Sequence, residues 1–168
     1  LRFLPGRLQA EKLQYHTLNS NPLRTKVAPV SLHSGNDTMK VICTEKSQVL
    51  ATQVAQALKT KVVDVKYSRF PDGEHYLQAG EIDDEMVIVG SVVDNDSLVQ
   101  LMLLVDACDT ATNRLVLPYM AYARQDKRFK AGEPISSRVV ARALSPGVSD
   151  VITVNIHEKE VLKSFSVP

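Results

Sequence analysis

Residues 85–120 read EMVIVGSVVDNDSLVQLMLLVDACDTATNRLVLPYM, and this stretch decides the fold class. Its first part, 85–93, is a run of β-forming residues that is long enough for a buried strand. The middle part, 96–108, has the 3.6-residue spacing of an amphipathic helix. The predicted buried stripe of this helix consists of Leu98, Leu101, Met102 and Val105. A further strand follows at 113–120, so the stretch predicts a βαβ unit with two parallel strands.

The same alternation continues upstream of this unit. A strand is predicted at 39–43, and a helix at 48–59 follows it, with Ser47 as its N-cap. The predicted apolar face of that helix consists of Leu50, Val54, Ala57 and Leu58. Residues 61–70 predict a strand, and a short strand around 75–78 follows after a Pro-Asp-Gly turn. These two strands are expected to form a small protruding hairpin.

Downstream of the central unit, the pattern repeats once more. A helix is predicted at 135–144 and ends at the Pro-Gly pair 146–147, a strand follows at 150–156, and 157–165 begins another helix. Strands that alternate with helices of about three turns predict an α/β fold whose parallel sheet is covered by helices on both faces. In such sheets, ligands bind at the carboxyl ends of strands. This rule directs attention to the loops after the last two strands and to the hairpin turn.

The composition is that of an ordinary globular protein, with 44% hydrophobic and 23% charged residues among 168. This length suits one domain, or one domain with a tail. A net charge of +1 provides no general basic field and argues against nucleic-acid binding. No apolar run approaches the ~18 residues of a membrane span. Cys43 and Cys108 are far apart, which argues against a disulfide framework or a zinc site and favours two buried thiols in a reducing compartment.

Residues 1–38 differ in composition from the rest of the chain. They contain three prolines, few acidic residues and no sustained period of 2 or 3.6 residues. One interpretation is a transit-type leader. The favoured interpretation is an unstructured or non-native extension before a domain that starts at Met39. His16 and His33 within this segment belong to no motif.

A cluster of cations follows the predicted strand at 113–120. Its members are Arg124, Lys127, Arg128 and Lys130. Arginine and lysine bind phosphate oxygens, arginine through two parallel hydrogen bonds. Gln125 can contact a base edge or a ribose hydroxyl, Gly132 lets the backbone bend, and a helix that begins near Pro134 would add free N–H groups. The alternative is a surface loop whose charges only keep it hydrated.

A histidine follows the last predicted strand. His157 can coordinate a metal or donate to a phosphate oxygen, and Asn155 points the same way on an extended chain. The alternative is a partly exposed histidine at a helix start. Because Mg²⁺ prefers oxygen ligands, a single histidine would need bound phosphates to complete the coordination shell.

The hairpin turn combines an aromatic ring with carboxyl groups. Phe70 can stack on a base, and Asp72 and Glu74 can accept hydrogen bonds from an exocyclic amine such as that of adenine. The alternative is an ordinary β-turn at Pro71-Asp72-Gly73 with no role in binding.

Taken together, three segments resemble one family, ribose-phosphate pyrophosphokinase. They are RFPDGE at 69–74, PYMAYARQDKRFKAGEPIS at 118–136 and VITVNIHEKEVLKSFSVP at 151–168. The resemblance covers 39–168, and the middle motif is long and specific. The Asn155-x-His157 pairing resembles archaeal members, because bacterial and animal members usually carry an aspartate at the first position. The CTEKS sequence after the first strand departs from the usual serine-glycine start.

The resemblance implies a phosphoribosyltransferase-like fold and a specific activity. The family transfers the β,γ-diphosphoryl group of Mg-ATP to the 1-hydroxyl of ribose 5-phosphate and releases AMP. The chain is accordingly expected to bind ATP, ribose 5-phosphate and Mg²⁺, to form a homo-oligomer in the cytoplasm, and to bind neither nucleic acid nor a membrane. Phosphoryl-type transfer needs mainly positioning and charge stabilisation, so no catalytic residue is assigned in this half.

The resemblance also implies an ATP site that two subunits share. The residues it assigns to ATP are Phe70, Asp72, Glu74, Arg124, Gln125, Asp126 and Lys127. The first three would come from a neighbouring subunit and hold adenine, and the others would come from this subunit. His157 would contact magnesium and phosphate. Asn155 stands where a metal-linked aspartate often lies, and an amide is a weaker ligand than a carboxylate.

The family normally has a second, similar α/β half with a ribose 5-phosphate loop and a mobile basic arm, and neither segment occurs in this sequence. We therefore interpret 39–168 as an N-terminal ATP-binding domain without its C-terminal domain, and we expect a fragment that is inactive alone. Such a fragment is expected to expose an apolar face where the second half docks. The alternative function is that of a non-catalytic nucleotide-binding relative that regulates or scaffolds a synthetase.

Overall fold

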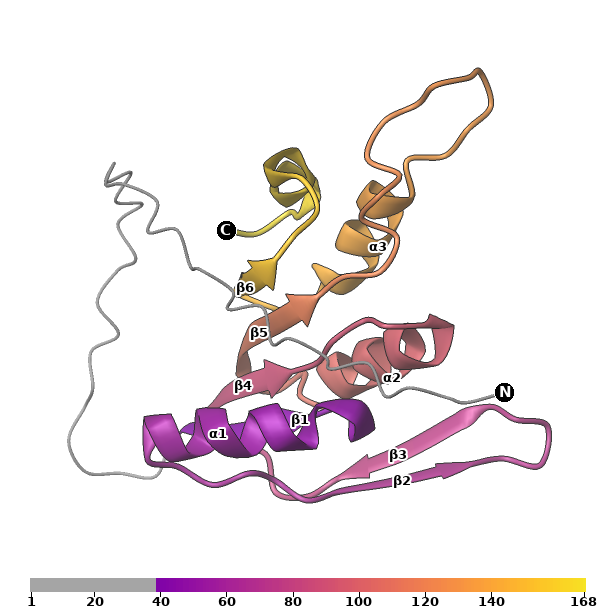
Figure 1. Cartoon of the computed structure of the whole chain (residues 1–168). Helices are drawn as coiled ribbons and strands as arrows, with labels where there is room; N and C mark the ends of the chain where they lie inside the picture. Colours follow the sequence, from indigo (N-terminus) through magenta and orange to yellow (C-terminus); the bar gives the residue numbers. More distant parts are fainter. Residues whose placement is uncertain (1–38) are drawn as a thin grey trace, which may run out of the picture. The chain divides into compact units, whose positions relative to one another are not determined.

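A four-stranded parallel sheet forms the centre of the protein (Figure 1). The computed structural model describes residues 39–168, and the predicted extension before them, with His16 and His33, lies outside the described residues. The strands follow the order β1-β4-β5-β6 across the sheet, and each neighbouring pair is parallel. Their bounds are Met39–Cys43 for β1, Glu85–Val89 for β4, Thr112–Tyr119 for β5 and Asp150–Asn155 for β6. The predicted parallel α/β fold is confirmed.

Helices cover both faces of this sheet. They are α1 (Gln48–Leu58), α2 (Asn95–Asp106), α3 (Ser136–Leu144) and two 3₁₀ helices, η1 (Glu45–Ser47) and η2 (Lys159–Ser164). α1 packs on one face, whereas α2, α3 and η2 pack on the other. The helix predicted to begin at 157–165 is therefore a short 3₁₀ helix. Within 39–168, no helix combines the length and the apolar character that crossing a bilayer requires.

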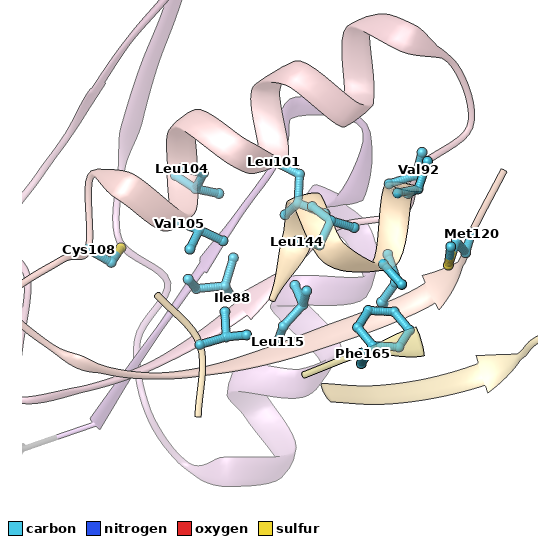
Figure 2. Close-up of a cluster of buried hydrophobic side chains, with 14 of the residues drawn as sticks. Ile88, Val92, Leu101, Leu104, Val105, Cys108, Leu115, Met120, Leu144 and Phe165 are labelled. Atoms are coloured by element: carbon cyan, nitrogen blue, oxygen red, sulfur yellow. The ribbon is translucent and has the colours of Figure 1, made fainter. Parts of the chain in front are cut away.

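The larger core lies between the sheet and α2 and α3. Ile88 and Leu115 point from neighbouring strands toward Leu101 and Leu104 of α2 (Figure 2). All four side chains are fully buried. Burying an aliphatic side chain of this size stabilises a fold by roughly 1.5–3 kcal/mol. This layer therefore fixes β4 and β5, and the loop that carries the predicted cation cluster follows β5.

The buried stripe of α2 differs from the prediction at one position. Leu101 and Val105 are buried as predicted, but Met102 is 41% exposed and Leu104 is buried in its place. α2 contacts the sheet through Leu101, Leu104 and Val105. Leu98 and Met102 therefore lie at the border of its buried face, where Leu98 is partly buried and Met102 is exposed.

The predicted face of α1 packs on the sheet in part, since Leu50, Val54 and Leu58 contact the core, but the most buried residues of the helix lie beside it. Ala51 and Ala55 are buried against β1 and β4, because their small side chains let the helix approach the strands closely. Ala57 is exposed. The partly buried flanks of this line are Leu50, Val54 and Leu58. Ser47 precedes α1 as predicted, but its side chain makes no cap bond. Its hydroxyl instead accepts the backbone N–H of Ser91 at 3.1 Å.

A two-stranded antiparallel hairpin extends from the sheet, formed by β2 (Val65–Arg69) and β3 (His75–Ala79) (Figure 1). Its first strand starts later than predicted, because Val62 forms a bridge with Val41 of β1 instead. The predicted turn is present, and Gly73 has a φ of 97°, a conformation that favours glycine.

The sheet face that carries α1 is open at its far end. On β6, Ile152 is 47% exposed and Val154 is 80% exposed. Their strand neighbour Val116 belongs to the α1 side, but α1 itself packs on β1 and β4. β6 therefore exposes apolar side chains on this face of the sheet. The docking of a second domain on this face stays a prediction.

Candidate functional site

A cleft opens at the carboxyl ends of β5 and β6, where the loops after the two strands meet. Tyr119 at the end of β5 pairs with Asn155 at the end of β6, so the loops after the two strands start side by side at the carboxyl edge of the sheet. The cleft has a volume of about 530 Å³. Its lining residues are Tyr119, Met120, Ala121, Tyr122, Ala123, Arg124, Gln125, Ser136 and His157. Its position agrees with the rule that ligands of open α/β sheets bind at the carboxyl ends of strands.

Arg124 and Gln125, both predicted to bind ATP, line this cleft. Gln125 is fixed by the start of α3: its side-chain oxygen accepts a hydrogen bond from Ser136 Oγ, and its backbone oxygen accepts the N–H and Oγ of Ser137, both at 3.2 Å. Within residues 39–168 the NH₂ group of Gln125 forms no hydrogen bond, so it can donate to a ligand. Arg124 is exposed at the mouth of the cleft. One side chain is thus oriented in advance, and the other is a cation that solvent reaches.

The floor of the cleft follows a strained backbone turn. Tyr122 has a φ of 66°, a left-handed conformation that costs a non-glycine residue of the order of 1 kcal/mol or more. Two contacts hold it: the Ala121 N–H donates to the Val92 oxygen at 2.8 Å, and the Tyr122 hydroxyl donates to the side-chain oxygen of Asn95 at the start of α2. The β4–α2 connection therefore fixes the turn that leads directly into Arg124.

Beyond the cleft, the chain forms an irregular loop with its own internal contacts. The Glu133 carboxylate accepts the backbone N–H groups of Phe129 at 2.7 Å and Lys130 at 3.0 Å. The ammonium of Lys127 lies over the Phe129 ring, 5.3 Å from its centroid, in a cation–π contact. Gly132 bends the chain with a φ of 87°, as predicted. Glu133 therefore organises the tip of the loop.

The cations of the loop have no acidic partners in the described part of the chain. Within residues 39–168, no ion pair joins a carboxylate to Arg124, Lys127, Arg128 or Lys130. The Glu133 carboxylate is occupied by backbone N–H groups. Cations without compensating acids are available to an anionic ligand, and one of these four, Arg124, lines the cleft. This arrangement favours the anion-site interpretation over that of a merely hydrated loop.

The helix after the loop begins later than predicted. α3 starts at Ser136 with Ile135 in the N-cap position, so Pro134 lies before the first turn. The Ser137 N–H is already bonded to the Gln125 oxygen. The Ser137 amide is therefore not free to bind an anion, and anion binding by the other amides of this helix start stays a prediction.

Phe70, Asp72 and Glu74 lie together on the hairpin turn and do not line the cleft of their own chain. The Phe70 ring is 50% exposed and packs edge to face on Tyr76, with centroids 5.7 Å apart. Asp72 Oδ1 accepts the Glu74 N–H at 3.2 Å, which helps to close the turn. Both carboxyl-bearing residues are exposed. The turn therefore presents a ring and carboxylates outward from its own chain.

His157 lines the cleft and is exposed, and Asn155 is the last residue of β6. Among the residues that the structure describes, no group of three or more His, Cys, Asp or Glu side chains could hold a metal ion. Because Mg²⁺ prefers oxygen ligands, a magnesium ion at this cleft would need phosphate oxygens of a bound nucleotide.

The two cysteines take no part in this site. Both are buried free thiols, as predicted. Burial raises the pKa of the Cys43 thiol, and burial together with the nearby Asp109 carboxylate raises the pKa of Cys108 to about 11. Both thiols therefore stay protonated at neutral pH, when they are poor nucleophiles.

These features define an α/β domain with a cleft, lined in part by Arg124, at the carboxyl edge of a parallel sheet. Residues 39–146 match the family described as the N-terminal domain of ribose phosphate pyrophosphokinase. The chain therefore belongs to this family, as its three motifs indicated.

Relatives of known name and structure extend this result. The chain is 47% identical to ribose-phosphate pyrophosphokinase of Methanosarcina mazei over 133 residues, which are 77% of this chain and 44% of that protein. It is 45% identical to the same-named protein of Halobacterium salinarum over 127 residues, 73% of this chain and 45% of that protein. The crystal structure of phosphoribosylpyrophosphate synthetase from Mycobacterium smegmatis superimposes with a TM-score of 0.70 at 27% identity, covering 78% of this chain and 47% of that one. The chain thus spans about half the length of the relatives it matches.

Three residues of the site were missed in the sequence, although all lie inside the quoted motif. Tyr122 sets the cleft floor, Ser136 orients Gln125, and Glu133 organises the loop tip. A serine close to a predicted helix start is a signal for a side-chain hydrogen bond at that end. A left-handed tyrosine carries no such signal, because its conformation is set by the contacts with Val92 and Asn95.

Proposed function

We propose that this chain forms the ATP-binding half of a ribose-phosphate diphosphokinase. The whole protein would transfer the diphosphate group of Mg-ATP to ribose 5-phosphate, giving phosphoribosyl pyrophosphate and AMP for nucleotide biosynthesis in the cytoplasm. The observation that carries the proposal is the cleft lined by Arg124 and Gln125, together with the lack of an acidic partner within residues 39–168 for Arg124 and the other cations of its loop. Membership of the family supplies the reaction class.

In this proposal the cleft and its loop hold the nucleotide from one side. Arg124 donates two parallel hydrogen bonds to phosphate oxygens. Gln125, oriented by Ser136, donates its NH₂ group to a ribose or base oxygen or nitrogen. Lys127 adds a point charge near the phosphates. Asp126 lies between these residues and is half-buried, and its assignment to the site rests on the resemblance alone.

The adenine ring would be held by the hairpin turn of a neighbouring subunit. Phe70 would stack on the base, and Asp72 and Glu74 would accept from its exocyclic amine. All three are exposed and lie outside the cleft of their own chain. This separation supports a homo-oligomer in which each ATP site combines two chains.

Magnesium is proposed to arrive with the nucleotide. His157 lies in the cleft and would contact the ion or a phosphate oxygen, while the nucleotide supplies most of the oxygen ligands. Asn155 ends β6, two residues before His157, and its assignment to the metal site rests on the resemblance alone. The bound ion would neutralise phosphate charge. The protein side of the chemistry is positioning, so the site needs no nucleophile of its own.

The test is ribose 5-phosphate-dependent AMP formation by the full-length gene product. With ATP and Mg²⁺ present, addition of ribose 5-phosphate should release AMP, and its omission should abolish the product. Residues 1–168 alone should bind Mg-ATP and release no AMP. A full-length protein that binds Mg-ATP without releasing AMP would instead be a non-catalytic relative. One that binds no nucleotide would contradict the site itself.

A further inference from the structure

Polar contacts hold the hairpin turn to the start of α2. The Arg69 guanidinium donates to the Asp96 carboxylate at 2.5 Å and to the backbone oxygen of Gly73 at 2.8 Å. His75 pairs with Arg69 across the hairpin, and its Nε2 lies 3.4 Å from the same carboxylate. Asp96 therefore meets both members of the last cross-strand pair before the turn.

His75 is the buried member of this cluster, with a side chain that is only 8% exposed. Its Nδ1 lies 3.4 Å from the amide nitrogen of Gln100, further along α2. That amide also donates to Glu45 at 3.2 Å. Within residues 39–168, Nε2 forms no hydrogen bond of good geometry, and its one ionic contact is with Asp96. A histidine was not expected to matter here, because no motif surrounds it in the sequence.

The inner face of the hairpin becomes less buried toward the turn. Near its base, Val65, Leu77 and Ala79 pack against the core. Next along the hairpin, the Tyr67 hydroxyl donates to the backbone oxygen of Cys43 at 2.5 Å. At the turn itself, Phe70 is 50% exposed. The Arg69–His75 pair is thus the last place where the hairpin is attached to the body of the protein.

We propose that Asp96 is a positioning residue for the turn that carries Phe70, Asp72 and Glu74. By holding Arg69 and His75, it fixes the direction in which the ring and the two carboxylates project toward a neighbouring subunit. Arg69 closes the arrangement from within, because it also binds the oxygen of Gly73 inside the turn. The inference rests on the proposed ATP site, in which this turn binds adenine.

Charge on Asp96 supports the arrangement. The Arg69 guanidinium, and to a smaller extent His75, hold the pKa of the Asp96 carboxyl below its usual value. The carboxylate therefore stays ionised throughout the neutral range and can accept from both partners. The two partners of the carboxylate differ in their surroundings, since the Arg69 side chain is 46% exposed and the His75 side chain is only 8% exposed.

Hydrogen exchange tests the attachment without any assay of activity. Two variants remove one partner each, Asp96→Asn and Arg69→Met, and Lys66→Met removes an exposed cation from the outer face of the same strand as a control. The reporter amides are those of Phe70 and Gly73, which bond to Glu74 and Phe70 oxygens within the turn. In both variants these amides should exchange about two- to fivefold faster than in the wild type. The double variant should exchange them little faster than either single variant. Lys66→Met should leave them unchanged.

Steady-state kinetics on the full-length enzyme test the role in nucleotide binding. Asp96→Asn and Arg69→Met should raise KM for ATP about two- to fivefold, while kcat and KM for ribose 5-phosphate stay unchanged. A general loss of structure would instead change all three parameters.

The outcomes separate this inference from the proposed function. Unchanged exchange of the turn amides in both variants overturns the attachment. Faster exchange with an unaltered KM for ATP overturns the positioning role, because the turn would then move without consequence for the nucleotide. If the wild-type enzyme releases no AMP, the proposed function fails, and Mg-ATP affinity measured by calorimetry replaces KM as the deciding quantity.

Discussion

The hairpin turn at 70–74 and the basic loop at 124–135 carry the residues predicted to bind ATP, and the chain holds them by different means. The hairpin turn is attached through charge, since Arg69 and His75 meet Asp96. The loop commits no cation to an ion pair within the described residues and is held through Gln125 at its base and Glu133 at its tip.

The difference separates two tasks in one proposed site. A segment that must present a flat ring at a fixed angle to another subunit gains from attachment to a helix. A segment that must surround flexible phosphates gains from cations that no carboxylate neutralises beforehand. Pairing of the loop cations with acids of the same chain would oppose anion binding, whereas pairing of Arg69 does not.

The largest effect is expected from Arg124, the cation that lines the cleft and that forms no ion pair within residues 39–168. In the proposed site, Arg124→Ala would remove two charge-assisted hydrogen bonds to phosphate, worth roughly 1.5–3 kcal/mol each, so Mg-ATP affinity should fall about 100-fold or more. Its exposed position predicts an unchanged melting temperature. Calorimetric titration of Mg-ATP measures the effect.

Arg142→Ala provides the matched control, because Arg142 is exposed in the last turn of α3 and does not line the cleft. Its nucleotide affinity should equal that of the wild type. Equal affinities of the Arg124 and Arg142 variants would remove the basis of the proposed site.

A smaller effect is expected from the hairpin ring. Phe70→Ala removes a stacking surface worth roughly 1–3 kcal/mol, so Mg-ATP affinity should fall about tenfold with the fold intact. Phe129→Ala removes an even more exposed ring, 73% accessible, from the basic loop. Because that ring packs on Lys127 and is not assigned to adenine, its removal should change affinity less. The reverse order would move the adenine site from the hairpin to the loop.

The smallest effect concerns the titration of Asp96. A carboxyl whose folded pKa is lowered contributes stability that is fully present above its ordinary pKa of 3.8 and is lost as the pH falls through the lowered value. The ¹³C carboxyl resonance of Asp96 should therefore titrate below 3.8, and Arg69→Met should raise its pKa. A wild-type midpoint at or above 3.8 would show that Arg69 does not bind this carboxylate in solution.

Periodicity predicted the order of strands and helices, but it could not decide which side of α2 packs inward. Residues 98–105 are apolar almost all round, so Leu104 and Met102 are equivalent by pattern, and the position of the sheet selects Leu104. For the site, the sequence predicted more. Arg124, Gln125 and His157 follow from a contiguous motif and a strand end, and they meet in one cleft.

Contacts between distant parts of the chain were beyond the reach of sequence pattern. Arg69 and Asp96 are 27 positions apart and belong to a hairpin and a helix, and neither residue type is unusual in its own segment. The left-handed Tyr122 depends in the same way on Val92 and Asn95. These features result from tertiary packing and leave no local signature.

The level pairing of Tyr119 with Asn155 has a consequence for how such a site can change during evolution. Side chains alternate along a strand, so deletion of one residue within β6 would turn the strand residues on one side of the deletion to the opposite face of the sheet and would shift the start of the loop that carries His157. The loop between Gln125 and Ser136 has no regular alternation of side chains, and insertions there cost little conformational entropy. Ligand preference can therefore drift through the length of the loop, whereas indels in the two strands would destroy the cleft in a single step.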